Sequence, residues 1–600
     1  MKTSSQDSTL LLEGAPAMNQ ARGIDAPIAG TDEAVAQPSV KTHWVLLPLF
    51  VLVTLTVYYP FARHNLPVAA NVDDRTSLSV LRRFAEGSAN PKFFMYPTLY
   101  YYLTYAVTAP FGFAKILFTG RLLNLGFVGL TAFLSYLFCL KNFKSAGAGM
   151  VAACCVIASP TLISSGAYLC TDVLLAALTM LSLHLLIGYF QSGSSRAWLY
   201  AMLAVGGAIA TKYTAGILFV TYCLVEVVHS YRQTRLNEEG VQSTRARFSE
   251  TTITVALVSA SVVALLAAIF FPVQTILHFV AVHRTNVEAR SLQDYLMFLS
   301  RLRRLLVELA AAAVILLVAV KRSRLVYESI STKRLYFGLL IVLAVFFITT
   351  PYSVLDPGKF IYDIGALLRS NVVVKGSQQQ WGNYWHWLFD TERRVPVIAG
   401  LIGLGLMAYR APWRYLTASV YVLVYVVTIC SSHLGVRRYL DPLLPLLYCG
   451  AGLTALEIWR GRPRIPVLIW KGLVCLAGVI VLIQIARETE TDVKAASEQD
   501  AFYSSYEEVL KVGAKGTVYY AGFAPSVELE LAGFRTKAIS WQELGGGTLG
   551  AQLSCDDLLI LNERVPGVNQ VSVSQDQTVE LLLDDPRGQG QMVLGRKGCR

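Results

Sequence analysis

Long apolar runs recur between residues 44 and 485 of this chain, and basic residues lie at many of the gaps between them. A helix needs about 20 apolar residues to cross a bilayer, and fewer when neighbouring helices bury its ends. The chain is 54% hydrophobic and only 15% charged, whereas soluble proteins carry about 25% charged residues. The runs therefore predict a polytopic α-helical membrane protein.

The spacing of the runs predicts thirteen membrane spans. They are expected at 44–60, 121–140, 146–164, 173–190, 198–211, 213–228, 253–271, 305–320, 335–349, 395–408, 415–431, 442–458 and 465–485. Cytoplasmic loops are enriched in Lys and Arg. The densest basic clusters fall on the side of the N-terminus only if residues 98–109 form a surface helix rather than a span. We therefore expect a cytoplasmic N-terminus and a C-terminus on the opposite side.

The two ends of the chain differ in composition from the apolar middle, 44–486. Residues 1–43 are polar and small, with no apolar period, which predicts a disordered cytoplasmic tail. Residues 487–600 show strand patterns at 517–520 and 557–561 and a helical pattern at 504–511, which predict a small α/β domain outside the cytoplasm. Cys555 and Cys599 of this domain are expected to form a disulfide in an oxidising compartment.

The net charge of the chain is +12, which Lys and Arg at cytoplasmic membrane borders explain. No basic block interleaved with aromatic residues lies outside the membrane, so the sequence predicts no nucleic-acid partner. The cysteines show no CxxC or Cys/His metal spacing.

Two adjacent acids, Asp73 and Asp74, lie in the outer loop 61–120. Acids this close to a membrane are costly unless they are solvated, paired or used. A carboxylate here could take a proton from an acceptor hydroxyl or amine that attacks an activated sugar. The alternative is helix capping, above all for Asp74, because a helical pattern starts near Arg75. The pair could also hold a divalent cation, but no third ligand is evident, so the sequence supports neither a metal nor another cofactor.

Further charged residues fall on the outer side in the same topology. Asp172 either caps the fourth span or faces the same cavity as the paired acids. Lys212, between the fifth and sixth spans, either extends to the interface or neutralises a phosphate leaving group. Arg437 and Arg438, after the eleventh span, qualify for the same phosphate role. His433 is either a proton relay or a structural residue.

Short motifs follow one another along the outer loops. They are Asp73-Asp74, Asn90-Pro91, Phe94–Tyr100, Gly120-Arg121-Leu122, Ser159-Pro160, Thr171-Asp172, Thr211-Lys212-Tyr213, Thr350-Pro351-Tyr352, Asp356-Pro357, and Arg438-Tyr439-Leu440 with Pro442 and Pro445. In this order, covering about residues 44–460, they resemble the GT-C superfamily. The nearest resemblance is to the bacterial group with family 39, the protein O-mannosyltransferases, and the aminoarabinose transferases of lipid A. The chain departs from that pattern with Asp74 where Glu is usual and Thr98 where a second Pro is common.

The resemblance implies a GT-C-like transmembrane domain at 44–486 in a multi-pass protein of the bacterial inner membrane. It implies transfer of a hexose or pentose from a polyprenyl-phosphate donor to a lipid, glycan or protein acceptor at the non-cytoplasmic face. Asp73 takes the place of the family's catalytic acid, with Asp74 beside it. Tyr352 joins the candidate substrate-binding residues named above.

Two other functions compete with this interpretation. A secondary transporter of a lipid or sugar would show internal repeats and broken helices near the midplane of matching halves, and neither is evident in the sequence. A structural protein that only presents the C-terminal domain would not need charged residues converging on the outer ends of several spans.

Overall fold

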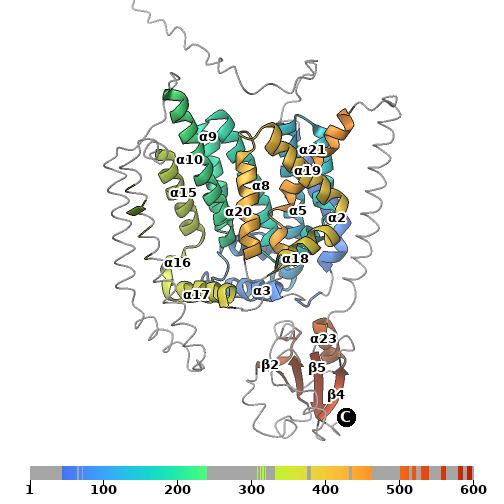
Figure 1. Ribbon diagram of the computed structural model, residues 1–600. Helices are drawn as coiled ribbons and strands as arrows, with labels where there is room; N and C mark the ends of the chain where they lie inside the picture. Colours follow the sequence, from blue (N-terminus) through green and yellow to red (C-terminus); the bar gives the residue numbers. More distant parts are fainter. Residues whose placement is uncertain are drawn as a thin grey trace, which may run out of the picture. The chain divides into compact units, whose positions relative to one another are not determined.

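The computed structural model describes residues 43–63, 66–69, 72–238, 332–373, 380–431, 435–461 and 501–512, isolated positions between 307 and 318, and parts of 516–596. Helices dominate as far as residue 461 (Figure 1). The longer helices are α2 (Leu46–Arg63), α5 (Ile116–Phe143), α8 (Asp172–Ser192), α9 (Ser195–Ile209), α10 (Gly216–Glu238), α15 (Lys333–Thr349), α19 (Arg394–Arg410), α20 (Leu416–Ser431) and α21 (Leu444–Arg460).

Shorter elements connect these helices, and in Figure 1 α3 and α17 lie across the lower end of the bundle. The remaining α-helices are α3 (Val72–Ala85), α4 (Leu99–Thr108), α6 (Ala146–Ile157), α7 (Pro160–Gly166), α16 (Tyr352–Leu355), α17 (Pro357–Val373) and α18 (Gln380–His386). The other turns are the 3-10 helices η1 (Ala109–Phe111), η2 (Phe113–Lys115), η3 (Tyr213–Ala215) and η5 (Arg437–Leu440), and the π-helical turn η4 (Trp387–Thr391).

Four described helices are long and apolar enough to cross a membrane, at Leu46–Arg63, Phe113–Phe143, Asp172–Ser192 and Tyr213–Tyr231. The pair α6 and α7 passes the same test as one bent span. Helices α15, α19, α20 and α21, with 16 or 17 residues each, coincide with the predicted spans nine to twelve. Spans seven and thirteen and most of span eight lie outside the described residues, so the number thirteen stays a prediction.

Two local expectations from the sequence are wrong. The third span is not continuous, because it breaks at Ser159-Pro160 and its two halves differ in direction by 57°. A proline lacks the backbone N–H that an uninterrupted helix needs, and the Ser159 hydroxyl instead accepts a bond from the N–H of Leu162. The stretch 350–394, where the sequence predicts only a connection between spans nine and ten, carries α16, α17, α18 and η4.

The core of the helical part is built around α5, which packs against α2, α6, α8 and α21. Helices α19 and α21 approach most closely where glycines face each other. A Cβ atom on Gly403 would overlap the backbone of Gly450, so only glycine allows this contact. The contact lies within α21, and η5 ends at Leu440, shortly before α21 begins.

The C-terminal residues differ in fold, since α23 (Ala501–Val512) is followed by strands. The strands are β1 (Thr517–Ala521), β2 (Arg535–Ala538), β3 (Leu558–Asn562), β4 (Val579–Asp584) and β5 (Gln591–Arg596). They form one mixed sheet in the order β2-β1-β3-β5-β4. β1 pairs in parallel with β2 and β3, and β5 pairs antiparallel with β3 and β4. Cys555 and Cys599 lie outside the described residues, so their disulfide stays a prediction.

Candidate functional site

The N-terminus of α3 is held in place by Asp74. One carboxylate oxygen of Asp74 lies 2.7 Å from the guanidinium of Arg121 on α5, and both side chains are almost fully buried. The other oxygen accepts the backbone N–H of Leu169 at 2.5 Å. The cap predicted for Asp74 is wrong, because α3 already begins at Val72 and both acids lie in its first turn. Asp74 therefore joins α3 to α5 and to the turn before α8.

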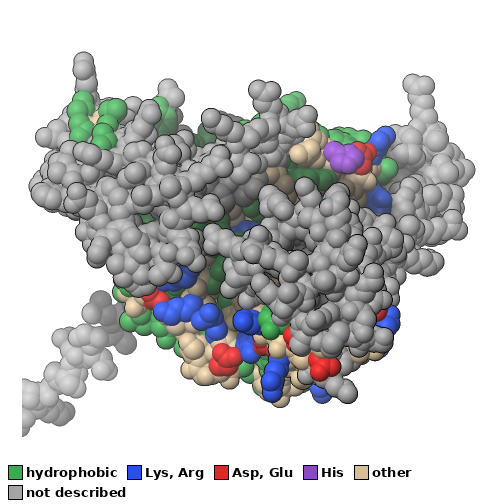
Figure 2. All heavy atoms as spheres, turned by 90° about the horizontal axis from the view of Figure 1, so that it is seen from below, with side chains coloured by type: hydrophobic (Ala, Val, Ile, Leu, Met, Phe, Trp, Pro, Cys, Tyr) green, Lys and Arg blue, Asp and Glu red, His purple; other side chains and the backbone are tan. Residues whose placement is uncertain are grey.

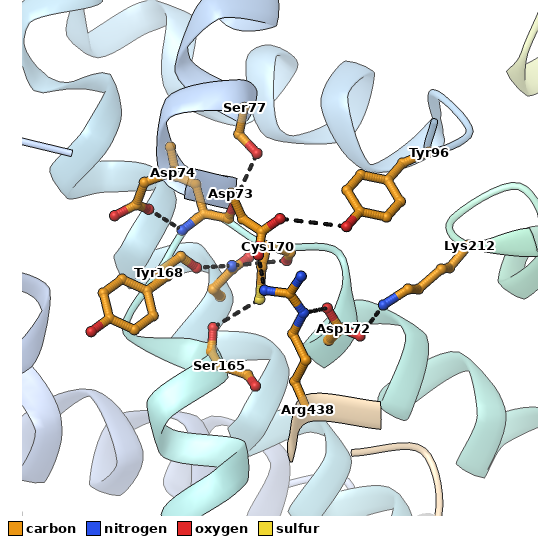
Figure 3. A network of polar contacts seen from close by, with 12 residues as sticks. Asp73, Asp74, Ser77, Tyr96, Ser165, Tyr168, Cys170, Asp172, Lys212 and Arg438 are labelled. Carbon is orange, nitrogen blue, oxygen red and sulfur yellow. Dashed lines mark hydrogen bonds and ion pairs between the residues drawn. The ribbon is translucent and has the colours of Figure 1, made fainter. Parts of the chain in front are cut away.

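Asp73 faces a different set of partners. Its side chain keeps 11% of its exposure, whereas that of Asp74 has none. One oxygen forms an ion pair with Nη1 of Arg438 on η5, and the other lies 3.4 Å from the hydroxyl of Tyr96 (Figure 3). Of the two adjacent acids, Asp73 is thus the one with access to a bound molecule.

Arg438 lies between two carboxylates that are far apart in the sequence (Figure 3). Besides the pair with Asp73, its Nε lies 3.6 Å from Oδ2 of Asp172, too far for a hydrogen bond. Burial lowers the pKa of the Arg438 guanidinium, although an arginine keeps its charge at any physiological pH. The structure therefore brings together three of the predicted site residues at one point.

Lys212 completes the cluster from the turn between α9 and η3. Its Nζ lies 2.5 Å from Oδ1 of Asp172, and both side chains are buried. The ammonium also lies over the rings of Tyr439, at 4.8 Å, and Tyr96, at 5.5 Å. Burial acts to lower the pKa of Lys212, but the charge and hydrogen bond of Asp172, together with Tyr439 and Cys170, raise the pKa above its ordinary value. The capping alternative for Asp172 is not observed, because Thr171 occupies the cap position and Asp172 pairs with Lys212.

A cavity of about 160 Å³ opens beside Arg438. Its lining residues come from α7, from the turn after it and from η5, and they are Ser164, Ser165, Tyr168, Cys170, Val436, Arg437 and Arg438. Both predicted outer arginines thus line one cavity, together with three hydroxyl groups that the sequence did not single out as site residues.

Asp441 is a site residue that the sequence analysis missed. Its side chain is fully buried at the end of η5. Burial, followed by the charge of Asp172, raises the pKa of Asp441 well above its ordinary value, while Ser165 and Lys212 act in the opposite direction. The Asp441-Pro442 pair in the sequence gave no signal beyond a helix start.

The loop 90–98 is held by polar contacts with Asp356, between α16 and α17, and with Asp363 on α17. Lys92 and Asn90 bind the carboxylate of Asp356 at 2.7 and 2.9 Å. Asp363 accepts the N–H of Phe94 at 2.7 Å. Burial acts to raise the pKa of Asp356, but hydrogen bonds from Lys92 and Asn90 lower it below the ordinary value.

Seen from below, acidic and basic side chains are interspersed on the coloured part of the molecule, as on a solvated face (Figure 2).

Two predicted site residues are not placed in the cluster. Tyr352 lies on α16, and the structure records no hydrogen bond from its side chain to Asp73, Arg438 or Lys212. His433 lies outside the described residues. Within the described part of the chain, no three His, Cys, Asp or Glu side chains are arranged to hold a metal ion.

Comparisons with known proteins bear on the family and on the fold. The sequence model of a family described as dolichyl-phosphate-mannose-protein mannosyltransferase matches residues 96–263. No curated protein matches the sequence. The structure is similar to ArnT from Cupriavidus metallidurans in the apo state, with a TM-score of 0.51 and 13% sequence identity, over 93% of this chain and 98% of that chain.

Two further solved structures have lower scores. ArnT from Cupriavidus metallidurans bound to undecaprenyl phosphate gives a TM-score of 0.49 and 14% identity, over 92% of this chain and 98% of that chain. The archaeal oligosaccharyltransferase AglB from Archaeoglobus fulgidus, in complex with an inhibitory peptide and a dolichol-phosphate, gives a TM-score of 0.47 and 11% identity. The match covers 87% of this chain and 69% of that chain. The chain has the helical fold of ArnT and resembles a membrane glycosyltransferase of the GT-C superfamily, similar to the protein mannosyltransferases.

Proposed function

We propose that this protein transfers a sugar from a polyprenyl-phosphate donor to an acceptor hydroxyl or amine at the non-cytoplasmic face of a bacterial inner membrane. The observation that carries the proposal is Asp73, a partly accessible carboxylate paired with an arginine that lines a cavity. A base and a phosphate-binding cation must meet at the same point for this reaction. The description of the family whose model matches residues 96–263 names a sugar linked to a lipid phosphate, dolichyl-phosphate-mannose. This description supports a polyprenyl-phosphate sugar as the donor.

In the proposed reaction, Asp73 acts as general base. The acceptor oxygen or nitrogen forms a bond to the anomeric carbon of the sugar and gives its proton to the Asp73 carboxylate. The bond between the anomeric carbon and the phosphate oxygen breaks, and the lipid phosphate leaves with the electron pair. Arginine side chains beside that oxygen neutralise the charge that develops on it. The acceptor is a lipid, a glycan or a protein, and the sugar is a hexose or a pentose.

The position of Asp73 is fixed by its neighbours rather than by its own contacts alone. Asp74, Arg121 and the Leu169 backbone hold the first turn of α3. The Ser77 hydroxyl, one turn later, donates to the Leu169 carbonyl at 2.7 Å. A general base must stay within hydrogen-bond reach of the proton it removes, and a rigid first turn provides that.

The test is sugar transfer by the purified full-length protein with Asp73→Asn. This change keeps the shape of the side chain and removes the base, so the rate at saturating donor should fall about 10²–10⁴-fold. Asp390→Asn is the matched control, because Asp390 is an exposed acid with its own Arg394 partner. Transfer at a near-normal rate by a folded Asp73→Asn protein would refute the proposed role, and failure of the wild type to release polyprenyl phosphate from any labelled donor would refute the function.

A further inference from the structure

The apolar core of the C-terminal domain contains a residue from the outer loop before α3. The domain itself contributes side chains from α23, from β1, from β3 and from the segment before β2, which are Tyr506, Val509, Val518, Leu529, Leu558 and Ile560. Val68 packs into this cluster and is fully buried. Among the described residues of the cluster, Val68 alone comes from before residue 501. It precedes Asp73 by five residues.

The residue after Val68 connects this contact to α3. Ala69 is fully buried, and its carbonyl accepts a hydrogen bond from Nε of Arg75 at 2.9 Å. Arg75 lies in the first turn of α3. The segment that packs into the C-terminal domain is therefore tied to the turn of the helix that carries Asp73.

A second contact joins the other end of α3 to the same domain. Arg82, in the last turn of α3, lies 2.8 Å from the carboxylate of Glu530, which is 448 residues away in the chain. Glu530 also accepts the hydroxyl of Thr536 on β2 at 2.6 Å. Exposed ion pairs contribute little to stability, and these two side chains are 40% and 39% exposed. The pair therefore orients the contact, while burial of the apolar Val68 side chain stabilises it.

The residues of α3 divide between two sides of the helix. Asp74 pairs with Arg121 of α5, and Ser77 donates to a backbone carbonyl in the turn before α8. Arg75 and Arg82 are seven residues apart, so they lie two turns apart on one side of the helix. The helical bundle thus holds α3 along one side, and the contacts of Val68 and Arg82 hold it at its two ends.

We infer that the C-terminal domain is a positioning element for catalysis, because it holds α3 through Val68 before the helix and Arg82 in its last turn, on either side of Asp73. The inference rests on the proposed function, which assigns the proton transfer to Asp73. Val68 and Arg82 are positioning residues that act through α3. Misplacing a reacting group by about 1 Å can cost about 10²-fold in rate, so contacts at the ends of α3 can control the rate of transfer.

The experiment measures backbone hydrogen exchange and sugar-transfer kinetics of the purified full-length protein. Val68→Asp places a charge in an apolar core, which is costly, and should release the segment from the domain. Exchange in residues 72–85 should then become faster, and kcat should fall about 10–100-fold while the KM for the donor stays unchanged. Val68→Ile keeps an apolar side chain at this position and should keep both the slow exchange and the rate.

A charge reversal tests the second contact without disturbing the core. Arg82→Glu places a like charge opposite Glu530 and should lower kcat by a smaller factor than Val68→Asp, because this pair is exposed. Adding Glu530→Arg restores opposite charges and should restore kcat. Lys511→Glu is the matched control, since it reverses an exposed charge of the same domain whose partner, Glu508, lies on the same helix. It should change neither the exchange of α3 nor the rate.

Two results with Val68→Asp would overturn the inference. Unchanged exchange in residues 72–85 would show that the domain does not hold α3, and faster exchange with an unchanged kcat would show that it holds α3 without positioning Asp73. If this variant also speeds exchange in β1 and β3, the charge reversal decides, and failure of Glu530→Arg to restore kcat overturns the inference. Absence of sugar transfer by the wild type would instead refute the proposed function, while exchange would still report the contact.

Discussion

The two adjacent acids of α3, Asp73 and Asp74, should differ clearly in how much each contributes to the free energy of unfolding. Asp74 and Arg121 form a pair with side-chain exposures of 0% and 1%. Asp74→Asn removes one charge and leaves the Arg121 guanidinium buried without a counter-ion. Arg121→Met does the reverse. Asp73→Asn changes a more exposed group whose partner, Arg438, keeps Asp172 nearby.

The magnitude follows from the burial of this pair. Removing one partner of a fully buried ion pair costs about 3–5 kcal/mol, because the other charge is left uncompensated. Folded domains are stable by only about 5–15 kcal/mol, so each single change should remove a large part of the free energy of unfolding. The double variant Asp74→Asn/Arg121→Met removes both charges, and Asn can still accept the Leu169 N–H. Its stability should therefore return to near that of the wild type.

The assay is unfolding of the purified protein in mixed micelles, for the wild type, the two single variants and the double variant. The coupling free energy from this cycle should be about 3 kcal/mol or more. The pair Asp390 and Arg394, whose side chains are 43% and 74% exposed, gives a matched cycle for which we expect little coupling. Asp73→Asn should lie close to the wild type in stability while losing transfer.

Two outcomes would refute this assignment. If Asp74→Asn is as stable as the wild type but inactive, Asp74 is the base and the roles of the two acids are exchanged. If the double variant is no more stable than the single variants, the Asp74–Arg121 pair is not what holds the first turn of α3.

Two further predictions follow from the buried groups around Arg438. Lys212→Met should weaken undecaprenyl phosphate binding by leaving Asp172 unpaired. Adding Asp172→Asn to this variant should restore much of the lost affinity. No recovery of affinity would show that Lys212 binds the phosphate itself. Asp441 has a raised pKa in the folded state, so the folded protein holds a proton that the unfolded chain releases above about pH 4, and stability falls as pH rises. Asp441→Asn should therefore gain melting temperature over the wild type between pH 5 and 8, and a pH-independent difference would contradict this.

The sequence predicted the helical elements well wherever one apolar run makes one helix. The runs at 121–140, 173–190 and 395–408 fall within α5, α8 and α19. It did not predict α17, because its alternating polar and apolar residues do not form a long apolar run and it lies across the end of the bundle in Figure 1. Hydropathy detects helices that cross a membrane more readily than amphipathic helices beside it.

The sequence located the acid pair, and the family resemblance favoured Asp73 as the catalytic acid, but the sequence did not show what each carboxylate contacts. Neighbouring residues on an α-helix point about 100° apart, since a turn contains 3.6 residues. Asp74 therefore faces Arg121 on α5, while Asp73 faces Arg438, which is 365 residues away in the chain. Only the packing of α3 against α5 and η5 decides which acid is buried, and no local pattern contains that information.

The break in the third span shows how a distant residue shapes the site. Pro160 cannot supply a backbone N–H, and the helix restarts there as α7, at 57° to α6. Buried Glu392 stabilises the break: it accepts the Ser159 hydroxyl at 2.7 Å and the Thr161 N–H at 2.8 Å. It also accepts the Tyr448 hydroxyl of α21 at 2.5 Å. These bonds replace those that a straight helix would make.

The bend has a direct consequence for the cavity. The change of direction at Pro160 sets the course of α7, which brings Ser164 and Ser165 to the cavity wall, and of the turn after it, which carries Cys170 and leads to Asp172. A straight continuation of α6 would carry these residues elsewhere and leave Arg437 without hydroxyl neighbours. The broken span is therefore the element that places hydroxyl groups beside the two arginines on η5, and Glu392 is the residue that holds the span in its broken form.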